Sequence, residues 1–80
     1  MSQETQKLNP KVTQNPLIGV FTVENFEATQ LHIVYDINRM VLKISIINGE
    51  LNLCNEPKEI YLLRIQRNGG EWISKKLIKF

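Results

Sequence analysis

The sequence predicts an all-β domain, either a sandwich or a small barrel, built from about seven short strands. Three observations lead to this fold class. The chain has 80 residues, which is the length of one domain. Its apolar residues are mostly Ile, Leu and Val, which favour strands over helices. They alternate with polar residues in short segments separated by turn residues, and no segment keeps a helical period.

The first ten residues are expected to form a flexible linker, because residues 1–9 are polar, mixed in charge and without periodicity. The β domain is expected over residues 11–80. Its strands are predicted over residues 11–15, 19–26, 29–35, 40–46, 50–53, 60–67 and 71–79. Pro10 and Pro16 bracket the first strand, which suits a sheet edge because proline is tolerated at strand starts and edges.

The middle strands alternate with the two-residue period of a half-buried strand. In the second strand, one face carries Phe21 and Val23 and the other carries Thr22 and Glu24. In the third, one face carries Leu31, Ile33 and Tyr35 and the other carries Gln30, His32 and Val34. In the fourth, one face carries Met40, Leu42, Ile44 and Ile46. The more apolar face of each strand is expected to be the buried one.

Turn residues separate these strands. Residues 36–39 and 55–58 are expected to form a turn and a loop. Asn48-Gly49 is a strong hairpin signal, because both residues tolerate positive φ.

The closing hairpin around residues 68–70 allows two registers. A turn at Gly69-Gly70 would place Arg64 opposite Lys75, which brings two like charges together. A type I′ turn at Asn68-Gly69 would place Arg64 opposite Ile73 and is preferred.

Composition gives little support for catalysis. The chain has one cysteine, Cys54, which permits no intrachain disulfide and is expected at the core or its rim. Its one histidine, His32, is expected at the surface or rim. One His and one Cys cannot form a zinc cluster, no nucleophile accompanies the histidine, and the scattered glycines build no phosphate loop. No enzyme activity, cofactor or metal is therefore expected.

The sequence also bears on location. No apolar run is long enough to cross a membrane, so no transmembrane segment is expected. Residues 1–8 lack the charged and apolar regions of a signal peptide. A chain expressed as written is expected to stay in the cytoplasm, and export would need a signal on a longer precursor.

The closing hairpin is basic, and its cations are Arg64, Arg67, Lys75, Lys76 and Lys79. A surface that binds nucleic acid would also present interleaved aromatic residues for stacking. Only Tyr61 and Trp72 lie nearby, and both suit core or cross-strand packing. The net charge of +2 adds little, so nucleic acid is not an expected partner and a small nucleic-acid-binding barrel stays the weakest alternative.

A series of motifs in fixed order resembles a known family. The series begins with Asn15-Pro16, then Gly19-x-Phe21-x-Val23, then an apolar strand ending in Tyr35-Asp36-Ile37. It continues with Asn48-Gly49-Glu50-Leu51-x-Leu53, Pro57, Ile60-Tyr61-Leu62-Leu63-Arg64-Ile65, a glycine turn and Lys75-Lys76-Leu77-Ile78-Lys79. In order and spacing, residues 12–80 resemble the C-terminal sorting domain of type IX secretion system cargo in Bacteroidetes, also called the Por secretion tail.

The resemblance implies an immunoglobulin-like antiparallel β-sandwich that is not an enzyme. It implies a sorting role for a passenger domain that precedes the tail and enters the periplasm by the Sec route. An outer-membrane secretion translocon would recognise the tail, and its sortase-like processing protease would cleave it at the cell surface, leaving the passenger anchored or released. The residues assigned to the sorting motif are Asn15, Pro16, Gly19, Phe21, Tyr35, Asp36, Gly49, Tyr61, Leu63, Ile65, Lys75, Lys76, Leu77, Ile78 and Lys79. Among them, the terminal lysines are the expected contact residues.

Three positions depart from the family pattern. Gln14 replaces the usual first proline, the turn over residues 36–39 lacks the usual glycine before its arginine, and Glu59 replaces a glycine. Non-glycine residues at positive φ are strained, so a glycine restored at position 59 should raise stability if that site needs positive φ. A stand-alone interaction module with no export role stays open as the second hypothesis.

Overall fold

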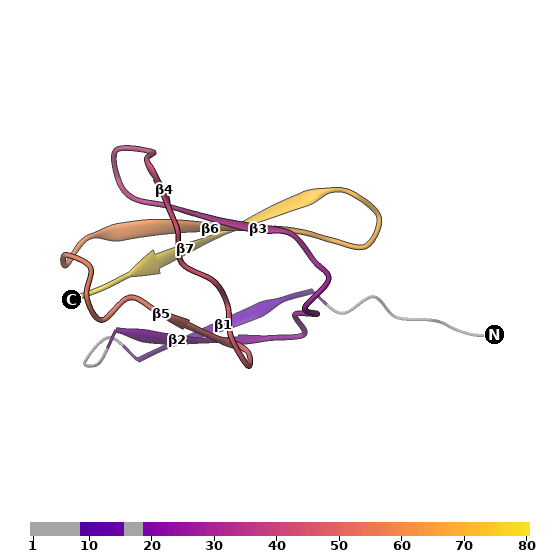
Figure 1. Ribbon diagram of the computed structural model, residues 1–80, viewed down its shortest axis with the longest axis horizontal. Coiled ribbons are helices and arrows are strands. Elements are labelled where there is room, and N and C mark those ends of the chain that lie inside the picture. The colour runs from indigo at the N-terminus through magenta and orange to yellow at the C-terminus, as the bar shows by residue number, and fades with distance from the viewer. Residues whose placement is uncertain (1–8, 16–18) are drawn as a thin grey trace.

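The computed structural model describes residues 9–15 and 19–80, which form two antiparallel sheets packed face to face, with no helix among them (Figure 1). The strands are β1 (Lys11–Asn15), β2 (Val20–Glu24), β3 (His32–Tyr35), β4 (Val41–Leu42), β5 (Glu50–Asn52), β6 (Ile60–Gln66) and β7 (Trp72–Ile78). The prediction of an all-β sandwich of about seven short strands is confirmed. Most of the expected linker, residues 1–8, lies outside the described residues, whereas Pro10 is fully buried.

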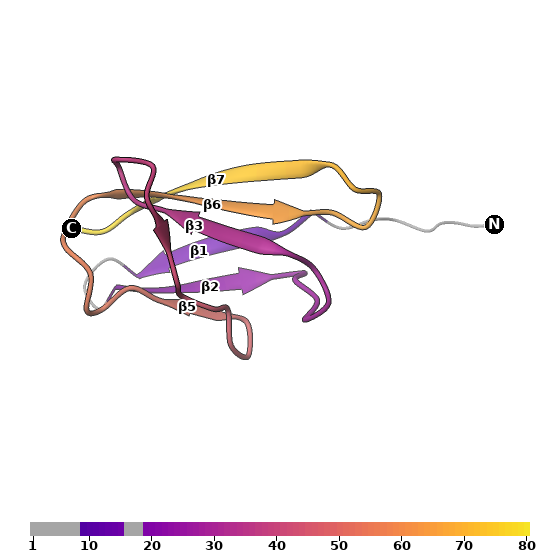
Figure 2. The same ribbon diagram turned by 45° about the horizontal axis from the view of Figure 1, so that its top comes forward.

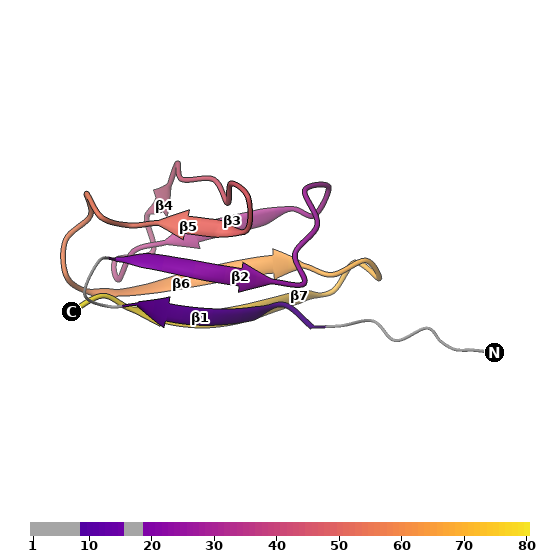
Figure 3. The ribbon, with the colours of Figure 1, turned by 90° about the horizontal axis from the view of Figure 1, so that it is seen from below.

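The strand order is immunoglobulin-like. One sheet has the order β1-β2-β5 and the other has the order β4-β3-β6-β7. In immunoglobulin constant domains the third, sixth and seventh strands share a sheet in the same way, but the fourth joins the opposite sheet. Here the fourth strand pairs with β3, and the chain then crosses to β5 in the other sheet (Figure 2). At one margin of the sandwich β1 lies beside β7 (Figure 3).

A core of apolar side chains fills the space between the sheets. Its fully buried members are Phe21, Val23, Val34, Leu51, Leu53, Tyr61, Leu63, Ile65 and Leu77. The alternation along β2, β5 and β6 places these residues on the inner faces, as the period of two requires.

The predicted phase of β3 is wrong. Val34 is 1% exposed and belongs to the core, whereas Leu31, just before the strand, is 59% exposed. Ile33 and Tyr35 lie on the opposite face from Val34 and are half-buried. Both faces of this strand carry large apolar side chains, so alternation alone could not select the core face. The outer face of this sheet is itself apolar, which is the physical reason for the error.

The predicted fourth strand is shorter than expected. Only Val41–Leu42 pairs as a strand, and Met40 is exposed, contrary to the prediction. Leu42, Ile44 and Ile46 do pack against the core, as predicted. Residues 43–46 run between the two sheets, where no neighbouring strand is available for pairing.

His32 holds this crossing segment in place. Its Nε2 atom accepts a hydrogen bond from the Ile46 amide at 3.2 Å, and its ring meets Phe26 edge-on at 5.5 Å. The histidine is half-buried and joins the start of β3 to the segment that leads to β5. Cys54, expected at the core or its rim, is exposed.

The hairpin turn at Asn48-Gly49 is confirmed. Asn48 has a φ of 52° and Gly49 a φ of 75°. Ile47 and Glu50 exchange two backbone hydrogen bonds of 2.9 Å across them. Two central residues with positive φ are the requirement of a type I′ turn.

The β6–β7 hairpin adopts neither expected register. Arg64 pairs with Ser74, because the loop has three residues. The Gly70 amide donates to the Arg67 carbonyl at 2.8 Å, and Gly70 then takes a φ of 96°. A glycine at positive φ after such a turn is the usual three-residue solution, and it shifts the register by one residue from the preferred prediction.

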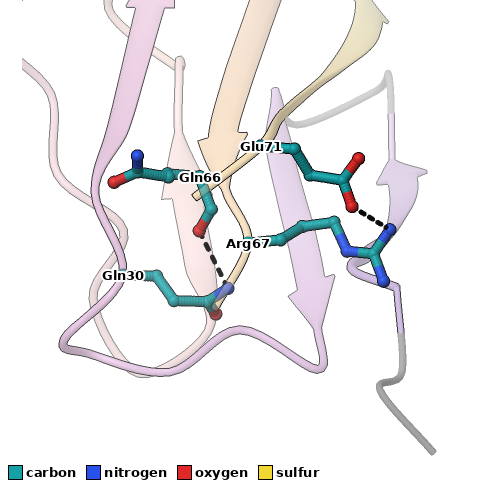
Figure 4. A network of polar contacts seen from close by, with 4 residues as sticks. All are labelled: Gln30, Gln66, Arg67 and Glu71. Atoms are coloured by element: carbon teal, nitrogen blue, oxygen red, sulfur yellow. Dashed lines mark hydrogen bonds and ion pairs between the residues drawn. The ribbon is translucent and has the colours of Figure 1, made fainter. Parts of the chain in front are cut away.

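Polar contacts close this end of the sandwich (Figure 4). The Gln30 side chain donates to the Gln66 carbonyl at 3.1 Å and accepts from the Glu27 amide at 2.7 Å. It therefore joins the loop after β2 to the end of β6. Arg67 and Glu71, which flank the hairpin loop, form an ion pair of 3.0 Å.

Candidate docking surface

Five of the predicted motif residues are core residues. Phe21, Tyr61, Leu63, Ile65 and Leu77 are each no more than 1% exposed. Their side chains fill the sandwich from both sheets and are not available to a partner. They position the surface that a partner could reach.

The Lys79 ammonium is used inside the domain. Its Nζ atom donates to the carbonyl oxygens of Leu53 at 2.8 Å, Cys54 at 3.0 Å and Glu56 at 2.6 Å. An ammonium has three donors, so these carbonyls satisfy all of them. Lys79 therefore ties the segment after β7 to the loop after β5, and it is not the free contact residue that the sequence suggested.

Gly19 packs against this lysine. Its φ is 70°, and a Cβ atom at this position would lie 3.1 Å from Lys79 Cε and 3.3 Å from Cys54 Cα. The Gly19 carbonyl also accepts from the Leu53 amide at 2.8 Å. Both the backbone conformation and the close approach require glycine. The second and last motifs of the series thus meet at one end of the sandwich.

Tyr61 forms a tyrosine corner. Its hydroxyl donates to the Pro57 carbonyl, four residues before it. In immunoglobulin-like sandwiches a tyrosine near the start of the sixth strand makes the same kind of bond. Burial raises the pKa of Tyr61 above its usual value, and the carboxyl groups of Glu59, Glu56 and Asp36 raise it further. The phenol is therefore held neutral.

Asp36 organises the β3–β4 turn. Its Oδ1 atom accepts from the amides of Asn38 at 2.8 Å and Met40 at 2.9 Å. Arg39 completes the turn with a φ of 65°, in the left-handed region that favours glycine.

By contrast, Glu59 is not among the described residues with positive φ. The condition for a stabilising glycine at position 59 is therefore not met.

The three terminal lysines have different environments. Lys75 lies on the inner face of β7 with Leu77 and is half-buried, and Lys79 is bonded as described. Of the three, Lys76 alone points outward from the second sheet. Two other motif residues lie elsewhere: Gly49 is in its hairpin, and Asn15 ends β1 opposite Val20. Pro16 lies outside the described residues.

The outer face of the four-stranded sheet is a candidate surface for a partner. Register and alternation place on it Ile33, Tyr35, Val41, Ile60, Leu62, Arg64, Gln66, Trp72, Ser74, Lys76 and Ile78. Val41 is 60% exposed, Ile60 42% and Leu62 37%. Exposed apolar side chains that lie next to one another make this face the candidate for an interaction surface.

One cross-strand row runs over all strands of this sheet. The row crosses β4, β3, β6 and β7 in that order, and its residues are Val41, Tyr35, Leu62 and Lys76. Three apolar side chains are therefore followed by one cation in a single line.

An open groove of about 600 Å³ lies on this outer face, beside the β3–β4 turn. Its lining consists of Tyr35, Asp36, Ile37, Arg39, Ile60, Tyr61, Leu62, Arg64, Ser74 and Lys76. This groove, called the outer groove below, is large enough to take several side chains of a partner.

Arg64 is fixed within the outer groove. Its guanidinium lies 5.3 Å from the centre of the Trp72 ring, within the range of a cation–π contact. Its Nε atom is buried and has no hydrogen-bond partner among the described residues. Over residues 9–15 and 19–80, neither Arg64 nor Arg39 nor Lys76 forms an ion pair.

Sequence reasoning missed the outer groove, although a signal was present. Ile60 and Leu62 alternate with Tyr61 and Leu63, so β6 is apolar on both faces. A strand with two apolar faces is either buried on both sides or carries a surface for a partner.

The chain matches no family model, and neither a curated protein nor a solved structure is significantly similar to it. Across the described ranges, no helix has the length and apolar character needed to cross a membrane.

Proposed function

We propose that this domain is a non-catalytic sorting signal that directs a passenger protein across the outer membrane through the type IX secretion system. The proposal starts from the order of motifs over residues 12–80, which resembles sorting domains of that system. The contact between Gly19 and Lys79 is the observation that carries it. It joins the second and the last of those motifs, whose residues Gly19 and Lys79 are 60 positions apart in the chain, into one local structure.

In this proposal the translocon reads the folded domain and not a linear tail. Most motif residues support that view, because they serve the core, the turns or the Lys79 contacts. Mutating them would therefore act on export through folding. The outer groove and the apolar row across it are the proposed contact surface for the translocon.

The processing protease would act outside the sandwich. We assign its cleavage to the segment that precedes β1, between the passenger and the sandwich. Its products would be the free or anchored passenger and the detached domain.

An export assay tests the proposal. A Sec signal peptide and a fluorescent passenger are fused ahead of residues 7–80 and expressed in a type IX-competent host and in a translocon-deficient mutant. Passenger at the surface or in the medium of the competent host alone is the expected result. Passenger held in the periplasm of both hosts would overturn the sorting role.

Two variants separate recognition from folding in the same assay. Lys79→Met should reduce export together with melting temperature, because it removes bonds inside the domain. Val41→Thr should reduce export at nearly unchanged melting temperature, because Val41 is 60% exposed on the outer face. Lys11→Gln, on the opposite sheet, serves as the matched surface control.

The second candidate function is a stand-alone interaction module. The exposed apolar row on the outer face favours it, because such a surface suits a protein partner in any compartment. The export assay separates the two functions. A module without a sorting role would leave the passenger in the periplasm, although its outer face would still bind a partner.

A further inference from the structure

The outer groove combines an apolar floor with cations at both ends. Tyr35, Ile60 and Leu62 form the apolar part. Arg39 lies at the end formed by the β3–β4 turn, while Arg64 and Lys76 lie on β6 and β7. The floor favours aliphatic side chains, and the ends favour negative charge.

The outer groove keeps a net positive charge, because its lining has three cations and one carboxylate. Asp36 is the acidic residue in the lining, and its Oδ1 atom is already bonded to two amides of its own turn. Arg67 and Glu71 form the ion pair at the far end of the hairpin and do not reach the groove lining. The groove cations therefore outnumber the one carboxylate of the lining, and none of them is held in an ion pair within the described residues.

We propose that the outer groove binds an extended peptide segment of a protein partner, in which an apolar residue is flanked by two carboxylates. The identity of the partner rests on the proposed sorting function, in which the peptide segment would belong to the secretion machinery. The binding itself depends only on the chemistry of the groove. The predicted pattern is acidic–x–apolar–x–acidic.

Strand geometry sets this spacing. Neighbouring strands lie about 4.8 Å apart, so the row from Val41 to Lys76 spans about 14 Å. An extended segment rises about 3.3 Å per residue, and side chains at i, i+2 and i+4 share a face, so the outer two lie about 13 Å apart. One carboxylate can then pair with Lys76, the neighbour of Leu62 in the row, and the other lies toward the β4 end, where Arg39 precedes Val41 by two residues.

Arg64 is prepared for such a carboxylate. Stacking on Trp72 restricts its guanidinium before any partner arrives, and a planar guanidinium pairs with a carboxylate through two parallel hydrogen bonds. Ordering this side chain in advance lowers the entropy lost on binding.

Two other occupants fit less well. A second copy of this domain packed on the same face would bring Arg39, Arg64 and Lys76 toward their equivalents and repel them. A nucleic acid would use phosphate contacts and stack its bases on aromatic rings, but the rings on this face, Tyr35 and Trp72, are half-buried, and Trp72 is already in contact with Arg64.

A peptide titration tests the inference. The probe is the peptide Ser-Glu-Thr-Leu-Thr-Glu-Ser with blocked ends, added to the ¹⁵N-labelled domain at low salt and followed by NMR. Saturable shifts at Tyr35, Leu62 and Lys76 are expected, with a dissociation constant below about 1 mM. Added salt should weaken binding, because the exposed charges are screened.

Charge reversal on the protein supplies the matched control. The double variant Arg39→Glu and Lys76→Glu should bind the probe at least tenfold more weakly, and both residues are exposed, so the fold should persist. Lys11→Glu changes an exposed charge on the opposite sheet and should bind as the wild type does. Equal binding by the double variant, or equal binding of a probe with Lys in place of Glu, would overturn the inference.

The remaining outcomes also decide the matter. No saturable shift up to about 5 mM probe, or shifts confined to the β1-β2-β5 sheet, would reject the peptide site. Tighter binding of a dT10 oligonucleotide on the same residues would replace it with nucleic acid. Shifts that grow with protein concentration alone would replace it with self-association.

The export assay distinguishes this inference from the proposed function. If the wild type is exported and the double variant is exported equally well, the groove is not the recognition site, although sorting stands. If the wild type is not exported but binds the probe as expected, the sorting role fails and the peptide site stands.

Discussion

The Lys79 ammonium lies 2.8 Å from the Leu53 carbonyl oxygen, and this bond ties the segment after the last strand to the end of β5. The carbonyls of Cys54 and Glu56 complete its coordination, while Gly19 packs against its stem. Residues from three parts of the chain therefore depend on one side chain.

We expect Lys79→Met to lower the free energy of unfolding by about 2–3 kcal/mol, since hydrogen bonds to a charged donor are worth about 1.5–3 kcal/mol and methionine retains the apolar stem. Urea denaturation followed by circular dichroism measures the change. Lys76→Met is the matched control and should stay within about 0.5 kcal/mol of the wild type, because Lys76 is exposed. Equal midpoints for both variants would contradict a structural role for the ammonium.

Gly19→Ala should destabilise the domain by about 2 kcal/mol or more. Alanine would have to adopt a φ of 70°, and its methyl group would lie 3.1 Å from Lys79 Cε. Gly70→Ala shares the positive φ but meets nothing within 4 Å, so it should cost only the backbone strain of about 1 kcal/mol. Thermal melting of the two variants gives the packing contribution as their difference, and a difference of zero would refute it.

Tyr61→Phe should lower stability at neutral pH by about 1–2 kcal/mol, because the Pro57 carbonyl loses its donor. The pKa of Tyr61 is raised in the folded state, so its contribution is complete below the ordinary tyrosine pKa of 10.0 and falls as pH rises toward the folded value. The stability gap between wild type and variant should therefore shrink above pH 10, as measured by urea unfolding at a series of pH values. A gap that stays constant from pH 7 to 11 would exclude the raised pKa.

Arg39→Gly should raise the free energy of unfolding by about 0.5–1 kcal/mol, because glycine adopts a φ of 65° without strain. Arg39→Ala removes the same side chain but keeps the strained backbone, so it should give no such gain. Differential scanning calorimetry compares the two melting temperatures. If alanine stabilises as much as glycine, the side chain and not the backbone is responsible.

Glu59→Gly should act in the opposite direction and lower stability by about 1 kcal/mol. Position 59 has no positive φ to relieve, and its carbonyl accepts from the Lys79 amide at 3.0 Å just before β6 begins. A higher melting temperature for this variant would show that glycine is favoured there for another reason.

The sequence predicted strand positions well and strand faces unevenly. The alternation in β2 identified Phe21 and Val23 as inward-facing, because polar Thr22 and Glu24 occupy the other face. In β3 the outer-face residues Ile33 and Tyr35 are as apolar as Val34, so no local signal shows which face is buried.

Contacts between distant residues were beyond reach. The sequence predicted Lys79 to be an exposed contact residue. No residue near it in the chain indicates that its ammonium binds three carbonyls more than twenty residues away. The hairpin register also escaped, since the Asn68-Gly69-Gly70 sequence suits both a two-residue and a three-residue loop. The outer groove arises only when β3, β6 and β7 are side by side.

The fluorescence of Trp72 reports on the outer face of the domain. This residue is the only tryptophan in the chain, and it lies beside Arg64 on the outer face, away from the core. Its emission should therefore respond to what occupies that face, while the near-ultraviolet dichroism of buried Tyr61 reports on the packed interior. Denaturation curves recorded by the two probes would coincide if the domain unfolds in one step. They would separate if the hairpin loosened before the interior opened.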